Sequence, residues 1–207
     1  MEIKQEMKNL FLGRNCSIGT GVLLGYPPAG KTEGELETRI GDNAAIRPYS
    51  VIYAGTTAGN NLMTGHGAFI RENTRIGNNV SIGTYAIIEH DVIIEDNVRI
   101  HSRAFIPEMT ILKKGSWIGP GATLTNAKFP TSKLAKEKLN GVIVGENAIV
   151  GANSTILPGV SIGKGAIIGS GSVVTKNVPE GEVWVGNPAK KIKKRSDLKY
   201  ETGEKAY

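Results

Sequence analysis

The chain has 207 residues, a formal net charge of +6 and a hydrophobic content of 40%, with aromatic residues at only 6%. No apolar run approaches the roughly 20 residues that a membrane-spanning helix needs, so we expect no membrane insertion. The first residues, MEIKQEMKNLFLG, lack the apolar stretch of a signal peptide, which predicts a cytoplasmic protein.

A six-residue period runs through most of the chain. In the central part, one frame is occupied by Ile40, Ile46, Ile52, Ala58, Thr64, Ile70, Ile76, Ile82, Ile88, Ile94, Ile100, Ile106, Leu112, Ile118 and Leu124. The same frame covers Leu12, Ile18 and Leu24, and it resumes at Val144, Val150, Ile156, Ile162, Ile168 and Val174. Neither a helix nor a strand repeats every six residues, so the chain must turn a corner in each unit. Such a fixed short repeat predicts a solenoid.

The residue three positions after each aliphatic residue indicates where the chain turns its corner. It is Asn or Gly in 17 of the 24 units, and these two residues adopt a left-handed backbone most readily. With three units per coil, 24 units make eight coils of 18 residues, stacked at a strand spacing of about 4.8 Å. We therefore predict an all-β fold, a parallel β-helix of about eight coils around a thin aliphatic core.

Two insertions interrupt the frame. Ten residues, GKTEGELETR, precede Ile40, and fourteen, PTSKLAKEKLNGVI, precede Val144. We predict a single domain with coils over 12–29 and 40–129, an extruded loop over 130–143, coils over 144–179 and a short, helical C-terminal tail over 180–207. Loops that leave a rigid scaffold commonly carry binding residues. A tolerated surface insertion is the alternative.

Residues 18 apart should lie above one another in the stack. One column contains Glu72, His90, Glu108 and Asn126, and a similar column on another edge contains His66, Thr84 and Ser102. Beside these columns, four units carry an unusual residue at the left-handed corner position, namely Tyr85, Asp91, Arg103 and Met109. Side chains that fit this backbone poorly indicate a local requirement, so we place the candidate site at residues 84–109. Tyr85 and Arg103 are 18 apart, and we expect the ring and the guanidinium to stack.

His90 is the candidate general base. Glu72 and Glu108 flank it at one coil's distance, and Asp91 follows it directly. A neighbouring carboxylate orients an imidazole and raises its basicity, and imidazole titrates near neutral pH. The alternative is that His90 is an exposed polar residue in a solvated column.

The repeat closely resembles that of the hexapeptide-repeat acyltransferases over about residues 12–188. The resemblance implies a left-handed parallel β-helix, a homotrimer with sites between subunits, and acyl-CoA chemistry. The segment IEHDV resembles the His-acid pair of bacterial acetyltransferases that modify a 4-amino nucleotide sugar. In that reading His90 is the base and Asp91 is its partner.

Four further segments, LGYPPAGK, TGHGAFIREN, LTNAKFP and VVTKNVPEGEVWVGNPAKKI, look like the branch that acetylates 3-amino nucleotide sugars. This likeness implies that Asn126 lies at the acyl-transfer region, which makes His90, Asp91 and Asn126 the expected catalytic residues. It also places His66, Arg71 and Glu72 on the side of the sugar nucleotide, although a structural role for His66 stays open. With the atypical column residues, the expected substrate-binding set is His66, Arg71, Glu72, Tyr85, Arg103 and Glu108.

One position departs from the superfamily pattern. Sugar and serine O-acetyltransferases of this superfamily carry a His-Pro pair at the extruded loop, whereas this chain has Phe129-Pro130. Phenylalanine cannot accept the proton of a hydroxyl acceptor. A sugar amine is already nucleophilic in its neutral form, so the change favours N-acylation over O-acylation.

The C-terminal coils are the expected site for acetyl-CoA. Glycines such as Gly151, Gly163 and Gly169 leave their edges bare for an extended pantetheine, or they serve only the turns. The resemblance implies that cofactor contacts come from Ala152, Ser170, Thr175, Lys176, Lys190 and Lys193. The lysines would pair with phosphates. No base-reading motif accompanies the basic charge, so we expect no nucleic-acid partner.

The predicted function is that of an acetyl-CoA-dependent N-acetyltransferase acting on a nucleotide-linked amino sugar, without a metal. An O-acetyltransferase of sugars or polysaccharides is the first alternative. A γ-class carbonic anhydrase is another, because that class uses the same prism and three histidines, and this chain has His66, His90 and His101. A non-catalytic scaffold is the last alternative.

Overall fold

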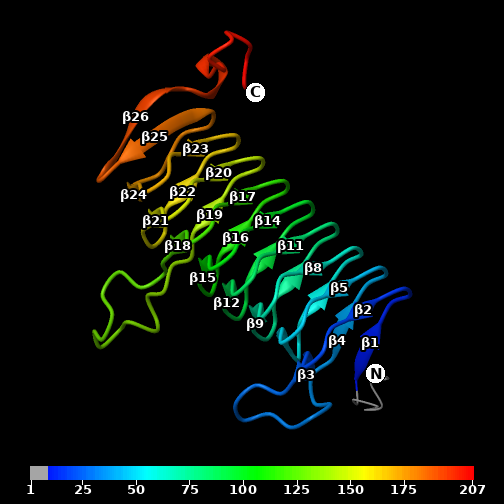
Figure 1. The fold of residues 1–207 in the computed structure, drawn as a ribbon. Coiled ribbons are helices and arrows are strands. Elements are labelled where there is room, and N and C mark those ends of the chain that lie inside the picture. Colours follow the sequence, from blue (N-terminus) through cyan, green and yellow to red (C-terminus); the bar gives the residue numbers. More distant parts are fainter. Residues whose placement is uncertain (1–8) are drawn as a thin grey trace.

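The computed structural model describes residues 9–207. Three parallel sheets wrap around one aliphatic core to form a long three-sided prism (Figure 1). Sheet A contains β1 (Leu10–Leu12), β4 (Thr38–Ile40), β7 (Thr57–Ala58), β10 (Arg75–Ile76), β13 (Ile93–Ile94), β16 (Ile111–Leu112), β19 (Ile143–Val144) and β22 (Ser161–Ile162).

Sheet B contains β2 (Ser17–Ile18), β5 (Ala45–Ile46), β8 (Met63–Thr64), β11 (Ser81–Ile82), β14 (Arg99–Ile100), β17 (Trp117–Ile118), β20 (Ile149–Val150) and β23 (Ile167–Ile168). Sheet C contains β3 (Leu23–Tyr26), β6 (Val51–Tyr53), β9 (Phe69–Ile70), β12 (Ile87–Ile88), β15 (Phe105–Ile106), β18 (Thr123–Leu124), β21 (Thr155–Ile156) and β24 (Val173–Val174). Each coil takes one strand from each sheet, so the predicted eight coils are confirmed.

The register of the sheets explains why a strand of two residues is enough. In the two-residue strands the second residue points inward while the first points outward. The inward residue is buried, as Ile88 and Ile100 are, except in β2 and β7, where Ile18 and Ala58 are partly buried. Neighbouring strands pair in parallel at a spacing of 18 residues in the central coils, for example Arg75 with Ile93. The buried residues therefore stack into one continuous core, and each burial contributes about 1.5–3 kcal/mol.

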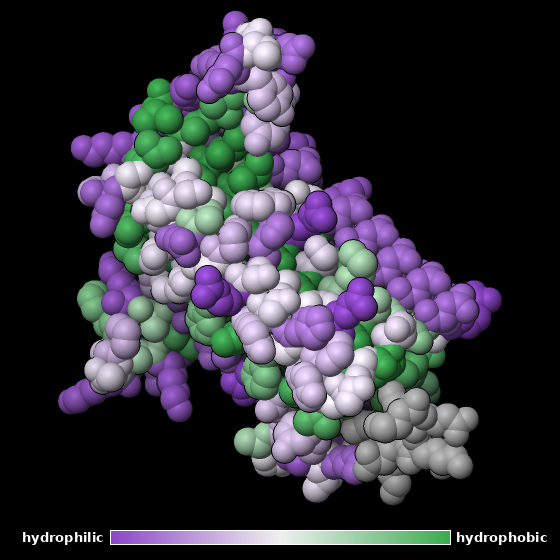
Figure 2. All heavy atoms as spheres, in the orientation of Figure 1, coloured by the Kyte–Doolittle hydropathy of each residue, from purple (hydrophilic) through white to green (hydrophobic). Residues whose placement is uncertain are grey.

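The corners form three edges along the prism. We name them the AB edge (corners such as residues 59–62), the BC edge (such as 83–86) and the CA edge (such as 89–92). On the AB edge the amides form a ladder, with Asn61 Nδ2 donating to Asn79 Oδ1 at 2.8 Å and Asn79 Nδ2 donating to Asn97 Oδ1 at 3.2 Å. Figure 2 shows the resulting hydrophilic ridge along one side of the molecule.

The left-handed corners occur where the sequence predicts them. Most are Asn or Gly, and the four atypical residues also adopt positive φ values: 55° for Tyr85, 56° for Asp91, 59° for Arg103 and 63° for Met109. Tyr49 is a further case, at 62°. A residue with a full side chain in this region costs roughly 1–2 kcal/mol relative to a right-handed backbone.

Two loops leave the prism, both on the CA edge (Figure 1). The first follows β3 and occupies residues 27–37, and the second follows β18 and occupies residues 125–142. The second loop consists of turns and contains no helix. Lys128, which falls at an inward position of the six-residue frame, is exposed there, so the chain leaves the coil before this residue.

The prediction of a helical tail is wrong. Strand β25 (Glu182–Gly186) adds in parallel to β23 at the end of sheet B, and β26 (Ala189–Lys194) returns antiparallel to it. Within the tail, residues 180–207, only η1 (Arg195–Asp197), a short 3-10 turn, is helical. The last coil would expose unpaired backbone groups and the end of the core. The hairpin forms because β25 pairs with those backbone groups and Trp184, 6% exposed, covers the end of the core.

The described part of the chain contains no helix with the length and apolarity that a membrane span requires.

Met109 offers a test of the corner strain. The exposed Met109 side chain holds a left-handed backbone, so Met109→Asn should raise the free energy of unfolding by about 0.5–1 kcal/mol. Equilibrium chemical denaturation at a fixed protein concentration measures this change. The reverse change, Asn97→Met, should lower the same free energy by more than this, because it also removes the hydrogen bond that Asn97 accepts from Asn79. A destabilised Met109→Asn variant would contradict the assignment of strain to this corner.

Candidate active site

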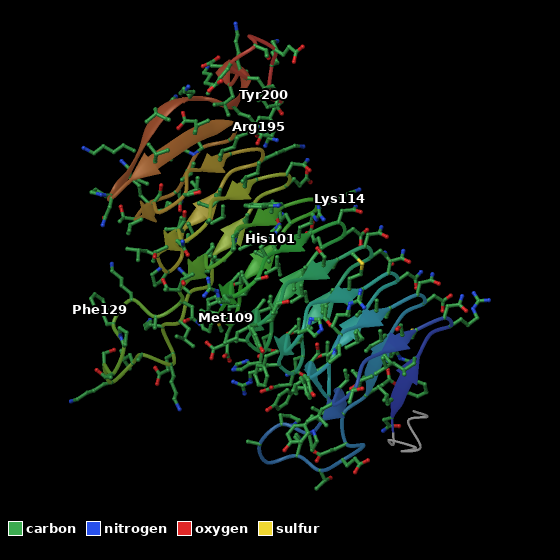
Figure 3. All side chains as sticks on the ribbon, viewed as in Figure 1. His101, Met109, Lys114, Phe129, Arg195 and Tyr200 are labelled. Carbon is green, nitrogen blue, oxygen red and sulfur yellow. The ribbon has the colours of Figure 1, made fainter. Side chains whose placement is uncertain are left out.

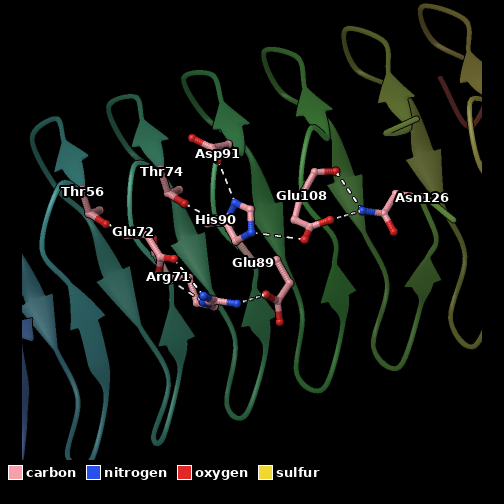
Figure 4. A network of polar contacts seen from close by, with 9 residues as sticks. All are labelled: Thr56, Arg71, Glu72, Thr74, Glu89, His90, Asp91, Glu108 and Asn126. Carbon is pink, nitrogen blue, oxygen red and sulfur yellow. Dashed lines mark hydrogen bonds and ion pairs between the residues drawn. The ribbon is translucent and has the colours of Figure 1, made fainter. Parts of the chain in front are cut away.

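A chain of polar contacts runs along the CA edge from β9 to the start of the second loop (Figure 4). His90 Nδ1 lies 2.7 Å from Asp91 Oδ2, and His90 Nε2 lies 3.1 Å from Glu108 Oε1. Asn126 Nδ2 donates to Glu108 Oε2 at 2.5 Å and lies 3.5 Å from the Glu108 carbonyl oxygen. Three successive coils thus supply His90, Glu108 and Asn126, as the 18-residue column predicts.

The corner backbone fixes these side chains in place. The Asp91 N–H donates to the Glu72 carbonyl at 3.2 Å. Below the corner, the buried Thr74 hydroxyl donates to the Glu89 carbonyl at 3.2 Å. The left-handed conformation of Asp91 turns its side chain back toward His90, and this contact accounts for an unusual residue at that position.

The contacts of His90 define how its proton is held. A neutral imidazole carries one N–H, so it can donate to only one of the two carboxylates. If Asp91 accepts from Nδ1, the lone pair of Nε2 points toward the Glu108 carboxylate. His90 is about one-third exposed, with a side-chain exposure of 31%, so solvent or a ligand can reach this pair.

A second cluster lies one coil away. The Arg71 guanidinium contacts Glu72 through two hydrogen bonds, at 2.8 and 3.1 Å, and it contacts Glu89 at 2.8 Å. Partial burial acts to lower the pKa of Arg71, but the hydrogen bonds to both carboxylates outweigh it, and this pKa is raised. Together the two clusters hold four carboxylates and one guanidinium, so the CA edge is locally acidic in a chain of net charge +6.

Glu89 is a site residue that the sequence analysis missed. It lies 18 residues after Arg71, so the column rule that grouped Glu72 with His90 also pairs Arg71 with Glu89. The signal was present in the sequence.

Three expected substrate-binding residues lie on a different edge within one chain. His66, Tyr85 and Arg103 are on the BC edge, whereas His90 and Asp91 are on the CA edge. The atypical corners at residues 84–109 therefore do not form one patch in a single chain. Consecutive units turn through different edges, so neighbours in sequence are separated by a whole sheet.

The predicted stacking of Tyr85 on Arg103 is wrong. The Tyr85 ring turns the other way and covers Gly67, where an added Cβ would lie 2.5 Å from Tyr85 Cε1. No cation–π contact joins Tyr85 to Arg103 within residues 9–207. The bare glycine in the preceding coil leaves room for the ring.

The residues expected to bind the cofactor lie at the C-terminal end, in three groups. Ala152 and Ser170 are on the BC edge of the last two coils, Thr175 and Lys176 follow β24 on the CA edge, and Lys190 and Lys193 are on the exposed strand β26. The Lys176 ammonium lies 5.4 Å from the centre of the Trp184 ring. These residues share the basic end of the prism, and none of their recorded contacts joins them to His90.

The three histidines do not converge in one chain. His66 lies on the BC edge, His90 on the CA edge, and His101 stacks against Trp117 on sheet B, with ring centres 4.5 Å apart. Among the described residues, no three His, Cys, Asp or Glu side chains are placed to hold one metal ion.

Comparison with known proteins identifies the repeat. Residues 73–108 and 141–176 match the family described as bacterial transferase hexapeptide (six repeats). These segments are therefore hexapeptide repeats, and the three-sheet prism that contains them is the predicted left-handed parallel β-helix. None of the curated proteins compared with the chain matches it.

Solved structures include relatives of the same shape. A Bacillus cereus protein described as a candidate acetyltransferase is 23% identical, with a TM-score of 0.56, and the match covers 88% of this chain and 87% of that one. This likeness shows a shared fold.

Two further structures match a shorter part of this chain. The acetyltransferase domain of PglB from Neisseria gonorrhoeae, solved with acetyl coenzyme A, is 20% identical with a TM-score of 0.43, and the match covers 68% of this chain and 56% of that one. A variant of GDP-perosamine N-acetyltransferase from Caulobacter crescentus, solved with CoA and GDP-perosamine, is 25% identical with a TM-score of 0.30, and the match covers 68% of this chain and 55% of that one. The chain spans a little over half the length of these two proteins.

The energetic coupling between Arg71 and Glu89 can be tested with a double-mutant cycle. Arg71→Met removes the cation between Glu72 and Glu89, and it should lower the free energy of unfolding by about 1 kcal/mol, less at high salt. Adding Glu89→Gln should recover part of this loss, because it removes the repulsion between the two carboxylates. Chemical denaturation of both single variants and the double variant measures the coupling. Purely additive effects would contradict it.

Proposed function

We propose that this protein transfers the acetyl group of acetyl-CoA to the amine of a nucleotide-linked amino sugar. The observation that carries the proposal is the placement of His90 between Asp91 and Glu108, with Asn126 holding Glu108. The match of two chain segments to a bacterial transferase repeat supports the transferase class.

The charge of the site favours an amine acceptor. A sugar amine is largely a cation near neutral pH, and the carboxylates of the CA edge attract a cation. At Glu108 the ammonium would replace the contact between that carboxylate and His90 Nε2, and the freed imidazole would accept a proton from the amine. Phe129 stands on the second loop, where related O-acetyltransferases carry a histidine, and Figure 3 shows it on the part of the loop that extends away from the prism.

The transfer step then follows ordinary acyl chemistry. The neutral amine nitrogen attacks the thioester carbonyl carbon and the C–N bond forms. The nitrogen then gives its surplus proton to solvent, and the C–S bond breaks as the carbonyl re-forms. The CoA sulfur leaves as a thiolate and takes up a proton, for which protonated His90 is the nearby donor. Asp91 holds the His90 ring through Nδ1, and a backbone N–H or Asn126 would donate to the developing oxyanion.

Acetyl-CoA would bind along the C-terminal coils, and this assignment rests on the sequence resemblance. The lysines at this end complement its phosphates. Lys190 and Lys193 are exposed on β26, and Lys176 lies nearby at the Trp184 ring. The acidic acceptor site and the basic end would thus each attract the substrate group of opposite charge.

A homotrimer would complete the site. The outer face of sheet C is apolar for most of its length, with Leu23 46% and Ile87 38% exposed, and near its N-terminal end Tyr53 packs edge-on between Tyr26 and Phe69. A face of this kind is suited to a subunit contact. If sheet C faces the threefold axis, the CA edge of one subunit meets the BC edge of the next. His66, Tyr85 and Arg103 would then approach the His90 of a neighbouring subunit.

The acceptor class is tested by thiol release. Purified protein with acetyl-CoA should release CoA thiol with UDP-, dTDP- or GDP-linked amino sugars and not with the corresponding hydroxyl sugars. Turnover confined to hydroxyl acceptors would replace the N-acetyl proposal with O-acetylation, and release with neither class would refute both.

The role of His90 is tested by substitution. His90→Ala should lower kcat/KM by about 10²-fold or more if it accepts the amine proton. Lys114→Ala, on the exposed AB edge, is the matched control and should leave the rate unchanged. An unchanged kcat/KM for His90→Ala across the pH range would remove the general-base role while leaving the acceptor class intact.

A further inference from the structure

A shallow groove of about 310 Å³ lies on the outer face of sheet B, beside the BC edge. It crosses strands β5, β8, β11 and β14 and is separate from the His90 network on the CA edge. The polar side chains that line it include Arg47, Ser81, Arg99, His101 and Ser102. Figure 3 places His101 on this face.

The charge of the groove is entirely positive. Arg47 and Arg99 line it, and no carboxylate does. Within residues 9–207, neither guanidinium forms an ion pair, whereas Arg14, Arg39 and Arg71 each pair with a carboxylate elsewhere on the prism. Two unneutralised guanidiniums on one face offer the charge and the paired N–H donors that phosphate groups require.

Neutral donors surround the two arginines. In the described chain, the hydroxyls of Ser81 and Ser102 make no hydrogen bond to another residue, so both remain available to a ligand. The ladder register places Ser81 directly beside Arg99 on neighbouring strands. A bound oxyanion would therefore meet charged and neutral donors from adjacent coils.

An aromatic pair lies at the side of the groove: His101 lines it, and Trp117 lies just outside its lining. Trp117 is the strand neighbour of Arg99, and its ring lies against His101 at 4.5 Å, tilted by 50°. His101 Nε2 is buried without a hydrogen-bond partner among the described residues. Burial, with a smaller effect from the Arg99 charge, lowers the pKa of His101, which favours the neutral ring. Trp117 thus offers a flat apolar surface next to the charged part of the groove.

We propose that this groove binds the diphosphate of a nucleotide, with Arg47 and Arg99 on the phosphates and the base against Trp117. The proposal deepens the proposed function, because it assigns the nucleotide of the acceptor to this groove, and to that extent it rests on that function. The binding itself requires neither acetyl-CoA nor His90. It places the sugar toward the BC edge, where His66 and Tyr85 lie.

The experiment measures binding of UDP and of inorganic pyrophosphate to the full chain by calorimetry, without acetyl-CoA. Both should bind, and Arg47→Gln and Arg99→Gln should each raise Kd by about tenfold or more, because each removes a charged hydrogen-bonding partner. Arg75→Gln is the matched control, an equally exposed arginine on the outer face of sheet A, and should leave Kd unchanged. The three arginines are on the surface, so the variants should fold.

NMR locates the ligand. The His101 ring signals should shift with both ligands, and the Trp117 indole signal should shift with UDP. Pyrophosphate binding with no Trp117 shift under UDP would overturn the assignment of the base. Equal Kd values in all variants, shifts confined to the lysine-rich end, or no binding by either ligand would overturn the site.

A last variant separates this proposal from the proposed function. His90→Ala should keep UDP binding while losing turnover. Loss of UDP binding in His90→Ala would place the nucleotide on the CA edge and overturn the groove. Intact groove binding with no thiol release from any amino sugar would refute the acetyl transfer and leave the nucleotide site standing.

Discussion

Between the two ends of the prism, each two-residue strand pairs in parallel with the strands one coil above and below it, and the other features of the molecule depend on this register. A corner must fit into four residues, so its third residue is forced into the left-handed region. The second residue of each strand is forced inward, which leaves room only for aliphatic or small side chains. The fold is therefore stabilised by one narrow core and by backbone ladders on three sides, without a large aromatic centre.

The same register turns each edge into a set of columns in which chemically related groups meet at one-coil spacing. On the AB edge the groups are amides, which satisfy one another in a ladder. On the CA edge they are ionic, and the ladder becomes the network of Arg71, Glu89, His90 and Glu108. The amide column on the AB edge is structural. The CA edge instead brings different ionisable side chains into contact, and for this reason we place the candidate site there.

Charge is distributed unevenly over this scaffold. The CA edge gathers carboxylates. The groove on sheet B presents arginines and no carboxylate, and in the C-terminal tail the basic residues outnumber the acidic ones. An amino-sugar nucleotide carries both an ammonium and a diphosphate. The acidic edge and the basic groove together offer complementary surfaces to such a molecule, and a trimer packed through sheet C would bring the two surfaces of adjacent subunits together.

The sequence by itself determined the repeat, the number of coils and the left-handed corners, because these follow from the six-residue period. It also determined the column of Glu72, His90, Glu108 and Asn126, because these residues are 18 apart and each coil has 18 residues. It also contained the pairing of Arg71 with Glu89, which the same count supplies. Only the tertiary structure decided which neighbour each side chain turns to. Tyr85 covers Gly67 rather than Arg103 because free space, and not spacing along the chain, selects a rotamer. The tail became a hairpin rather than a helix because the open end of sheet B offered unpaired backbone groups, which exist only once the coils are stacked.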